Sequence, residues 1–152
     1  MQNEFIAGQN IDLVLKKSKR NHPDIPRGME VCSREFDIVL HGTTTRVGEI
    51  TARLGFNDFI YYGGHVGFGI DEAYRGRGFA VEAVKLLEPV FSVNGIDKIY
   101  ITNNPDNAAC IRVCEKLGAR FIECAALPAN NNMRIKRGET HKNIFELDYR
   151  KL

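Results

Sequence analysis

One stretch of this sequence decides the fold: Asp71-Glu72-Ala73-Tyr74-Arg75-Gly76-Arg77-Gly78-Phe79-Ala80. It follows an apolar, strand-like run at residues 65–70, and a helical pattern begins directly after it. Gly76 and Gly78 have no side chain, so the backbone amides of this turn can approach a ligand closely. The free N–H groups of a helix's first turn and the helix dipole together form a site for a phosphate or pyrophosphate. Arg75 and Arg77 add positive charge beside that site.

The same stretch does not fit two common nucleotide-binding loops. No Gly-Lys-Ser or Gly-Lys-Thr follows the glycines, so it is not a Walker A loop. The Rossmann spacing G-x-G-x-x-G fails because Val81 stands where the third glycine is required. If the glycines are considered alone, a tight turn with two solvated arginines remains the alternative.

The spacing Arg75-x-x-Gly78-x-Ala80 resembles the pyrophosphate loop of the GNAT superfamily, the acetyl-CoA-dependent N-acetyltransferases. A second block, residues 104–119, is similar to the family's second cofactor motif, an Asn-led helix that ends in Lys116-Leu117-Gly118. The two blocks stand in the family's order, and together they cover about residues 60–124. The resemblance therefore covers the part of the chain that would bind the cofactor.

The resemblance implies that acetyl-CoA binds as a co-substrate and that no metal is needed. In the family, the strand before the loop and the strand after the first helix splay apart, and the pantetheine arm lies in the resulting notch. That arm pairs with backbone of the upstream strand. The residues implied for cofactor binding are Phe68, Gly69, Ile70, Arg75, Gly76, Arg77, Gly78, Phe79, Ala80, Asn104, Asn107 and Cys110.

Length and composition are those of one globular domain. The chain has 152 residues, of which 43% are hydrophobic and 26% charged, and these are ordinary values. A net charge of +2 does not by itself indicate nucleic acid or a membrane surface. No apolar run reaches the ~18 residues that a membrane span needs. The four cysteines lack zinc-site spacing, and we interpret them as reduced thiols.

We therefore expect one acyl-CoA N-acyltransferase domain, residues 1–152, in the cytoplasm, as a monomer or homodimer without a membrane partner. The N-terminus lacks the pattern of a signal peptide. A basic cluster comprises Lys16, Lys17, Lys19 and Arg20. We interpret it as a solvated run of charges, with an RNA contact as the alternative.

The hydrophobic pattern predicts a mixed α/β fold with about seven strands. The resemblance implies that these strands form a mostly antiparallel central sheet with a splayed cofactor notch. Pro89 should kink or end the first long helix, and Asn104 should cap the second. The expected strands are residues 11–17, 29–40, 46–54, 59–70, 96–102, 119–125 and 143–149. The expected helices are residues 77–93 and 104–117, and residues 126–140 are predicted to form a loop.

One departure from the family leaves the substrate open. GNAT domains usually place two helices between their first two strands, and those helices help to form the wall of the acceptor site. Here about a dozen residues rich in proline separate the two strands. We expect this helical pair to be reduced or absent, so the identity of the acceptor cannot be carried over from the family.

Acetyl transfer to nitrogen requires a neutral amine. A lysine-like amine with a pKa near 10.4 costs about 4.6 kcal/mol to deprotonate at pH 7, and an α-amine near 7.7 only about 1 kcal/mol. Glu49 and His65 are the candidate bases, either of which would act through water. Alternatively, Glu49 is a solvated strand residue and His65 is a structural imidazole. The sequence does not decide which of the two acts as the base.

The departing CoA thiolate needs a proton. Many GNAT enzymes supply it from a tyrosine four residues before the glycine that ends the second motif helix, and Cys114 stands there. It is a candidate general acid, or else a core thiol. The expected activity is transfer of acetyl from acetyl-CoA to a primary amine of a small molecule or protein, by direct attack in a ternary complex. A non-catalytic acyl-CoA-binding or regulatory domain is the alternative, and an RNA-contacting domain is a third.

Overall fold

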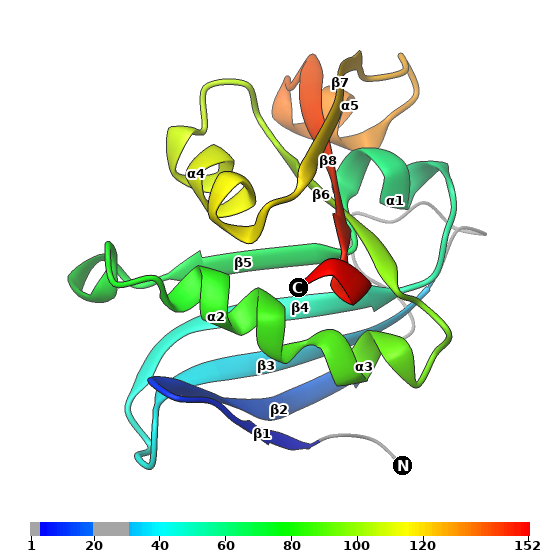
Figure 1. Cartoon of the computed structure of the whole chain (residues 1–152). Coiled ribbons are helices and arrows are strands. Elements are labelled where there is room, and N and C mark those ends of the chain that lie inside the picture. The colour runs from blue at the N-terminus through cyan, green and yellow to red at the C-terminus, as the bar shows by residue number, and fades with distance from the viewer. Residues whose placement is uncertain (1–3, 20–30) are drawn as a thin grey trace.

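The chain folds into two separate antiparallel sheets (Figure 1). The computed structural model describes residues 4–19 and 31–152. Within those residues, sheet A has the order β1-β2-β3-β4-β5 and sheet B the order β6-β8-β7. The strands are β1 (Phe5–Ala7), β2 (Ile11–Lys19), β3 (Cys32–Leu40), β4 (Arg46–Leu54), β5 (Val66–Ile70), β6 (Lys98–Asn103), β7 (Arg120–Ala126) and β8 (His141–Asp148).

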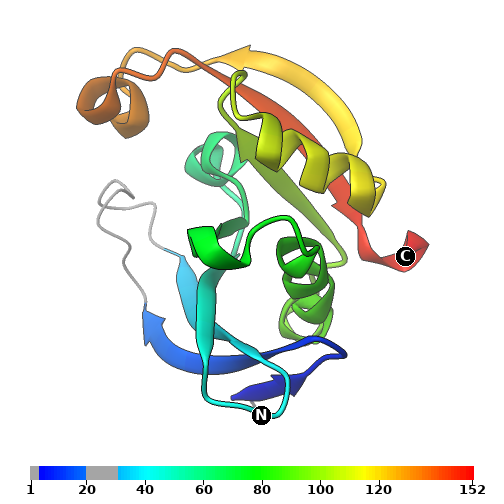
Figure 2. The same ribbon diagram turned by 90° about the vertical axis from the view of Figure 1, so that its left-hand side faces the viewer.

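Short helices connect the strands and cover the sheets. Helices α2 and α3 lie on one face of sheet A, and α4 lies beside sheet B (Figure 1). Turning the molecule by 90° shows sheet A on one side and α4, α5 and sheet B on the other (Figure 2). The helices are α1 (Asp58–Gly63), the 3-10 turn η1 (Glu72–Tyr74), α2 (Phe79–Leu86), α3 (Glu88–Ser92), α4 (Ala108–Leu117), α5 (Asn132–Arg137) and the 3-10 turn η2 (Tyr149–Lys151). No helix in the two described ranges is long and apolar enough to cross a bilayer.

One continuous hydrophobic core joins sheet A, α2, α3, α4 and sheet B. Alternate residues of the strands point into it, because successive side chains of a strand face opposite sides. Burial of each large apolar side chain stabilises the fold by about 1.5–3 kcal/mol. The side chains that meet in the core include Ile11, Leu13, Phe36, Ile38, Ile50, Val84, Leu87, Phe91, Ile99, Ile101, Leu117 and Leu147.

The predicted single sheet of about seven strands is corrected to two sheets of five and three strands. The mixed α/β class with antiparallel strands is confirmed. The strands β5 and β6 are the ones that would complete a single sheet, and they are not hydrogen-bonded neighbours. Just before β5, the backbone N–H of His65 donates to the carbonyl of Tyr100 in β6 at 2.9 Å. We call the gap that opens beyond this junction the notch.

The predicted strand at residues 59–70 is also wrong, because its first half is helix α1. The Asn57 side chain accepts a hydrogen bond from the Ile60 N–H at 2.9 Å and so caps the helix. Gly64 ends it with a φ of +82°, which glycine adopts without strain. The aromatic and β-branched residues between these caps favour a strand by composition, and the caps outweigh that preference.

Two further elements were not predicted. Residues 126–140 were predicted to be a loop, but they contain helix α5. The Asn131 side chain caps this helix by accepting from the Met133 N–H at 2.9 Å. Strand β1 pairs with β2 at the edge of sheet A. The expectation of a reduced or absent helical pair rests on residues 20–30, which lie outside the described residues.

The proline prediction is confirmed. The expected helix at 77–93 divides at Leu87 into α2 and α3, with Pro89 in the first turn of α3. Proline lacks an N–H, so its preceding turn cannot complete its hydrogen bonds. The Tyr149 hydroxyl donates to the Val84 carbonyl at 2.6 Å at this break, which also fixes the C-terminal end of sheet B against α2.

Glu82 of α2 holds the β1–β2 turn. Its Oε2 accepts from the backbone N–H groups of Gln9 at 2.8 Å, Asn10 at 3.0 Å and Ile11 at 3.4 Å. Its Oε1 accepts from the Asn10 side chain at 3.0 Å. Burial acts to raise the pKa of Glu82, but the hydrogen bonds from Asn10, Gln9 and Ile11 outweigh it, so the pKa lies below its usual range. The carboxylate therefore fixes the start of α2 relative to sheet A.

We predict that Glu82→Gln lowers the free energy of unfolding at pH 7 by about 1–3 kcal/mol, because hydrogen bonds to a charged group are lost. A carboxyl whose folded-state pKa is lowered contributes stability above its ordinary pKa and loses that contribution as the pH falls. The difference between the parent and the variant should therefore shrink in urea unfolding at acidic pH. Glu115→Gln, at an exposed position of α4, is the matched control. A difference that stays constant with pH would contradict this role.

Candidate functional site

A cavity of about 1040 Å³ lies in the notch and continues onto the outer face of sheet A. Its loop side comprises β5, the glycine loop, the start of α2, and α4. All residues predicted to bind the cofactor line it, except Arg77 and Asn104. Its far side comprises residues from β3, β4, α1, α5 and β8: Glu35, Glu49, Thr51, Arg53, Phe59, Gly63, Met133, Arg137 and Lys142.

The glycine loop owes its shape to backbone conformation. Gly76 has a φ of +79° and Gly78 a φ of +78°, in the left-handed region that other residues rarely adopt. A Cβ at either position would meet nothing within 4 Å, so the space above the loop is open to a ligand. Gly78 is the N-cap of α2 and offers no side-chain hydrogen bond. The first N–H groups of α2 therefore point into the cavity without a side-chain cap.

The two arginines of the loop have different positions. Arg75 lines the cavity, and its Nε donates to the carbonyl of Ile70 at 2.8 Å, which ties the loop to the end of β5. Arg77 lies outside the cavity, with its guanidinium 5.5 Å from the centre of the Tyr74 ring. This distance is in the range of a cation–π contact. Of the two loop arginines, Arg75 therefore brings positive charge to the cavity and Arg77 does not.

The predicted cap of the second motif helix is corrected. Asn107 is the N-cap of α4, and its Oδ1 accepts from the Cys110 N–H at 3.1 Å. Asn104 lies three residues earlier, and its backbone carbonyl accepts from the Asn107 N–H at 2.9 Å. Pro105 therefore belongs to a turn before the helix. Asn107 also lines the cavity, so one residue serves the helix and the site together.

The two cysteines of α4 differ in their access to the cavity. Cys110 lines it, whereas Cys114 is 0% exposed in the core and does not. The Asn103 side chain donates to Cys110 Sγ at 3.7 Å and to Cys114 Sγ at 4.0 Å. The hydrogen bond between the two thiols raises the pKa of Cys114 and lowers that of Cys110. The thiol that faces the site is therefore Cys110, not the predicted Cys114.

His65, one of the two candidate bases, is a structural residue. It is fully buried and does not line the cavity. Its Nδ1 accepts from the Tyr100 N–H at 2.8 Å, so its Nε2 carries the proton toward the Gly55 carbonyl at 2.9 Å. Burial lowers its pKa to about 4, which keeps the imidazole neutral. Both nitrogens are occupied, and neither is available for a substrate.

Glu49, the other candidate, does lie at the cavity. It stands on β4 opposite Gly69 of β5, and its side chain is 60% exposed. Its carboxylate accepts from Arg46 at 3.2 Å, and Arg46 also contacts Asp37 at 3.0 Å and Asp71 at 3.6 Å. The residue is thus held beside the edge strand of the notch, with its carboxylate open to solvent.

The far side of the cavity was not predicted from the sequence. Its members Phe59, Gly63, Met133 and Arg137 belong to α1 and α5, the two short helices that the hydrophobic pattern did not indicate. The capping residues Asn57 and Asn131 were the available signal. Of the basic cluster, Lys16 and Lys17 are exposed on β2 and do not line the cavity. No group of three metal-ligating side chains occurs among residues 4–19 and 31–152.

Comparisons with known proteins agree with this geometry. A family model described as an acetyltransferase (GNAT) domain matches residues 17–120. An acetyltransferase of Pectobacterium atrosepticum is 34% identical over 70 residues, which are 43% of this chain and 50% of that protein, so the chain spans about half the length of the curated relative it matches.

Solved structures share the fold. A GNAT-family protein from Chromobacterium violaceum has a TM-score of 0.69 and 13% identity, with 99% of this chain and 89% of that chain covered. The microcin C7 self-immunity acetyltransferase MccE, solved with acetyl-CoA and AMP, has a TM-score of 0.54 and 16% identity, with 76% of this chain and 61% of that chain covered. At these identities the match shows the fold alone.

We predict that Asn107→Ala lowers the free energy of unfolding by about 1 kcal/mol, the usual cost of a lost N-cap. Asn104→Ala should cost clearly less, because the bond that Asn104 makes uses its backbone carbonyl, which alanine keeps. Urea unfolding of both variants decides the matter. Equal losses, or a larger loss for Asn104→Ala, would show that the cap has been misassigned.

Proposed function

Because this chain belongs to the GNAT acetyltransferase family, we propose that it transfers an acetyl group from acetyl-CoA to a primary amine by direct attack in a ternary complex. One observation carries the proposal: the cavity runs without interruption from the glycine loop, through the notch, to the outer face of β4. A cofactor that enters on the loop side and an acceptor that enters on the far side would meet in the notch.

The loop side would hold the cofactor. The first amides of α2 and the Arg75 guanidinium are suited to the pyrophosphate, since both stabilise negative charge. Strand β5 pairs with β4 along one edge only, so its other edge has backbone groups free for the amides of the pantetheine arm. Asn107 and Cys110 line the opposite wall of the notch. These roles follow the family pattern and the position of each residue at the cavity.

Glu49 is the residue we assign as general base. The amine must lose a proton to attack the thioester, and an amine of lysine type is almost wholly protonated at neutral pH. Glu49 stands opposite Gly69, on the strand that would carry the pantetheine arm, and its exposed carboxylate can accept the proton through one water. Attack of the neutral amine on the acetyl carbonyl forms the amide bond and breaks the C–S bond.

Cys110 is the residue we assign to the departing thiolate. It is the thiol of α4 that lines the cavity, so its S–H would be the proton donor available to the departing thiolate. Asn103 holds both sulfurs, and its own Oδ1 accepts from Asn143 at 3.1 Å. This arrangement would place the proton donor one helical turn before the position at which the family usually has a tyrosine.

The test of the proposed function is release of free CoA from acetyl-CoA in the presence of a panel of amines and peptides. Release that depends on both the amine and the protein, with an acetylated product seen by mass spectrometry, supports the proposal. Tight CoA binding without release from any amine would favour the non-catalytic acyl-CoA-binding domain instead.

We predict that Gly78→Asp abolishes CoA binding, because it adds a negative charge where the pyrophosphate would lie. Gly78→Asn is the matched control, since asparagine has the same shape and tolerates a positive φ better than most residues. In calorimetry the asparagine variant should retain most of its affinity, and the aspartate variant should lose at least about tenfold more. Equal affinities in two folded variants would refute the proposed phosphate site.

We predict that Cys110→Ala lowers kcat by about 10²-fold, the usual effect of a missing general acid, with acetyl-CoA affinity nearly unchanged. Cys114→Ala should lower the melting temperature and change kcat by only a few fold, because Cys114 packs in the core. Cys124→Ala, at an exposed position of β7, is the control for loss of a thiol outside the cavity. Full turnover by Cys110→Ala would remove this thiol from the mechanism.

A further inference from the structure

The far side of the cavity carries carboxylates on sheet A and cations on α5 and β8, and it also includes Arg53 of β4, whose guanidinium donates to the carbonyls of Gly63 and Gly64. Glu35 and Glu49 lie on the outer face of β3 and β4, and Arg137 and Lys142 lie on α5 and β8. In Figure 1, α5 and the start of β8 lie together at one end of sheet B, away from the glycine loop and beside α1. An acceptor on this side would therefore have carboxylates on one flank and cations on the other. The two cations are separate from Arg75, which lies by the loop.

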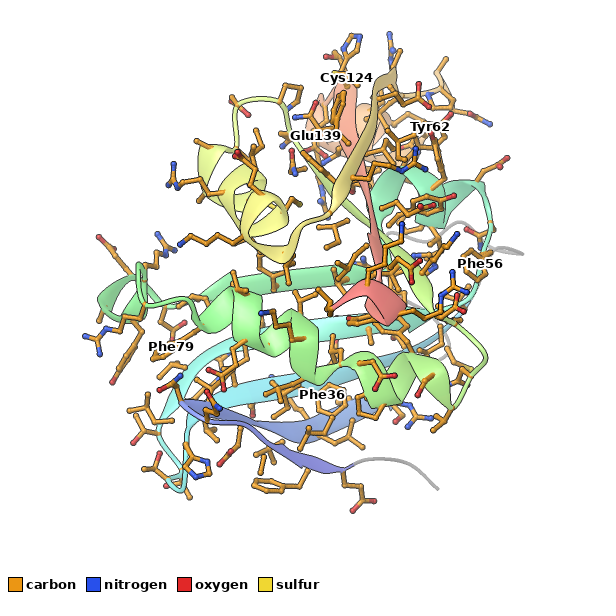
Figure 3. The ribbon with its side chains drawn as sticks, viewed as in Figure 1. Phe36, Phe56, Tyr62, Phe79, Cys124 and Glu139 are labelled. Carbon is orange, nitrogen blue, oxygen red and sulfur yellow. The ribbon has the colours of Figure 1, made fainter. Side chains whose placement is uncertain are left out.

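Lys142 lines the cavity and belongs to a largely buried ion pair. Its side chain is 9% exposed although it lines the cavity, and its Nζ contacts Glu139 Oε2 at 3.1 Å. An ammonium group has three N–H donors, and in the described part of the chain Lys142 donates to Glu139. Glu139 lies at the same end of sheet B (Figure 3), and its Oε1 is buried without a hydrogen-bond partner in the described structure. A buried ion pair with unused donors is costly unless another group completes it.

An anionic group in the cavity would complete this pair. A carboxylate or phosphate accepts hydrogen bonds from the N–H groups of Lys142 that Glu139 does not use, and Arg137 adds positive charge to the same side of the cavity. A second ammonium group at the same place would instead meet Lys142 as a like charge. The carboxylate flank at Glu35 and Glu49 attracts an amine in its charged form before it loses a proton.

We propose that the acceptor is a small zwitterionic amine, with an anionic group that binds Lys142 on the flank opposite Glu49. The inference rests on the proposed function for the amine and its acetylation, and it adds the chemical class of the acceptor. Lys142 acts as a specificity-determining residue. Simple alkyl amines and diamines should be poor acceptors.

The experiment compares acceptors that differ only in the anionic group: glycine, β-alanine and γ-aminobutyrate, each against its amide. The amide has the larger fraction of neutral, reactive amine at pH 7, because loss of the carboxylate lowers the pKa of the amine. A higher kcat/KM for the acid form of one spacing, by roughly tenfold or more, would therefore reflect recognition. The preference should persist in Lys136→Met, an exposed lysine of α5 outside the cavity.

The preference should vanish in the double variant Lys142→Met with Glu139→Gln, which removes both charges and so avoids a lone buried carboxylate. CoA affinity should stay unchanged in that variant. Equal or greater kcat/KM for the amides, or a preference that survives in the double variant, would overturn the proposal.

A second measurement does not depend on turnover. The acetylated acid and the acetylated amide of each pair are titrated into the protein–CoA complex by calorimetry. Tighter binding of the acid that is lost in the double variant supports the anion site even if no amine releases CoA, which would refute the proposed function alone. Amine-dependent CoA release with equal binding of acid and amide products would refute this inference and leave the proposed function intact.

Discussion

The junction between His65 and Tyr100 is the interaction on which the rest of the structure depends. The backbone N–H of His65 donates to the Tyr100 carbonyl, and its ring Nδ1 accepts from the Tyr100 N–H. The imidazole thus takes the acceptor position that a backbone carbonyl would fill in a continuous sheet. In the described residues this contact is not followed by pairing between β5 and β6, and from Val66 onward β5 pairs with β4. A backbone edge that faces a cavity needs hydrogen-bond partners, and this requirement makes the notch a place for a ligand.

The glycine loop lies between two fixed supports. On one side, Arg75 binds the last carbonyl of β5, and on the other, Glu82 ties α2 to the β1–β2 turn. The break of the helix at Leu87 is secured by the Tyr149 hydroxyl, so α2 is held at both ends. Such a loop does not need to be ordered when a ligand arrives, and the conformational cost of binding is correspondingly small. The same supports explain why the loop can adopt positive φ values at Gly76 and Gly78 and keep its shape.

Polar groups surround the notch at four places. The first amides of α2 and Arg75 lie at one end, and the pair Cys110–Cys114 lies on α4 with Asn103 between the sulfurs. Glu49 stands beside the open edge strand, held by Arg46. Lys142 and Glu139 close the other end under α5. These groups come from segments that are far apart in the sequence, and only the separation of the two sheets brings them to one cavity.

The sequence alone determined the glycine loop, the position of the second motif helix, the break at Pro89 and most strands, because each depends on local patterns of hydrophobicity and on glycine or proline. It also indicated most of the residues that line the loop side of the cavity. Tertiary structure decided the remainder. His65 and Glu49 looked equivalent as candidate bases until burial and the contact with Tyr100 placed one in the core and the other at the cavity. Which thiol of α4 faces the cavity depends on which helical face meets the sheet, so Cys110 and Cys114 could not be ranked from their spacing. Helices α1 and α5 are too short to show a clear hydrophobic period, and both depend on asparagine caps, with α1 also packing against β6 and β8.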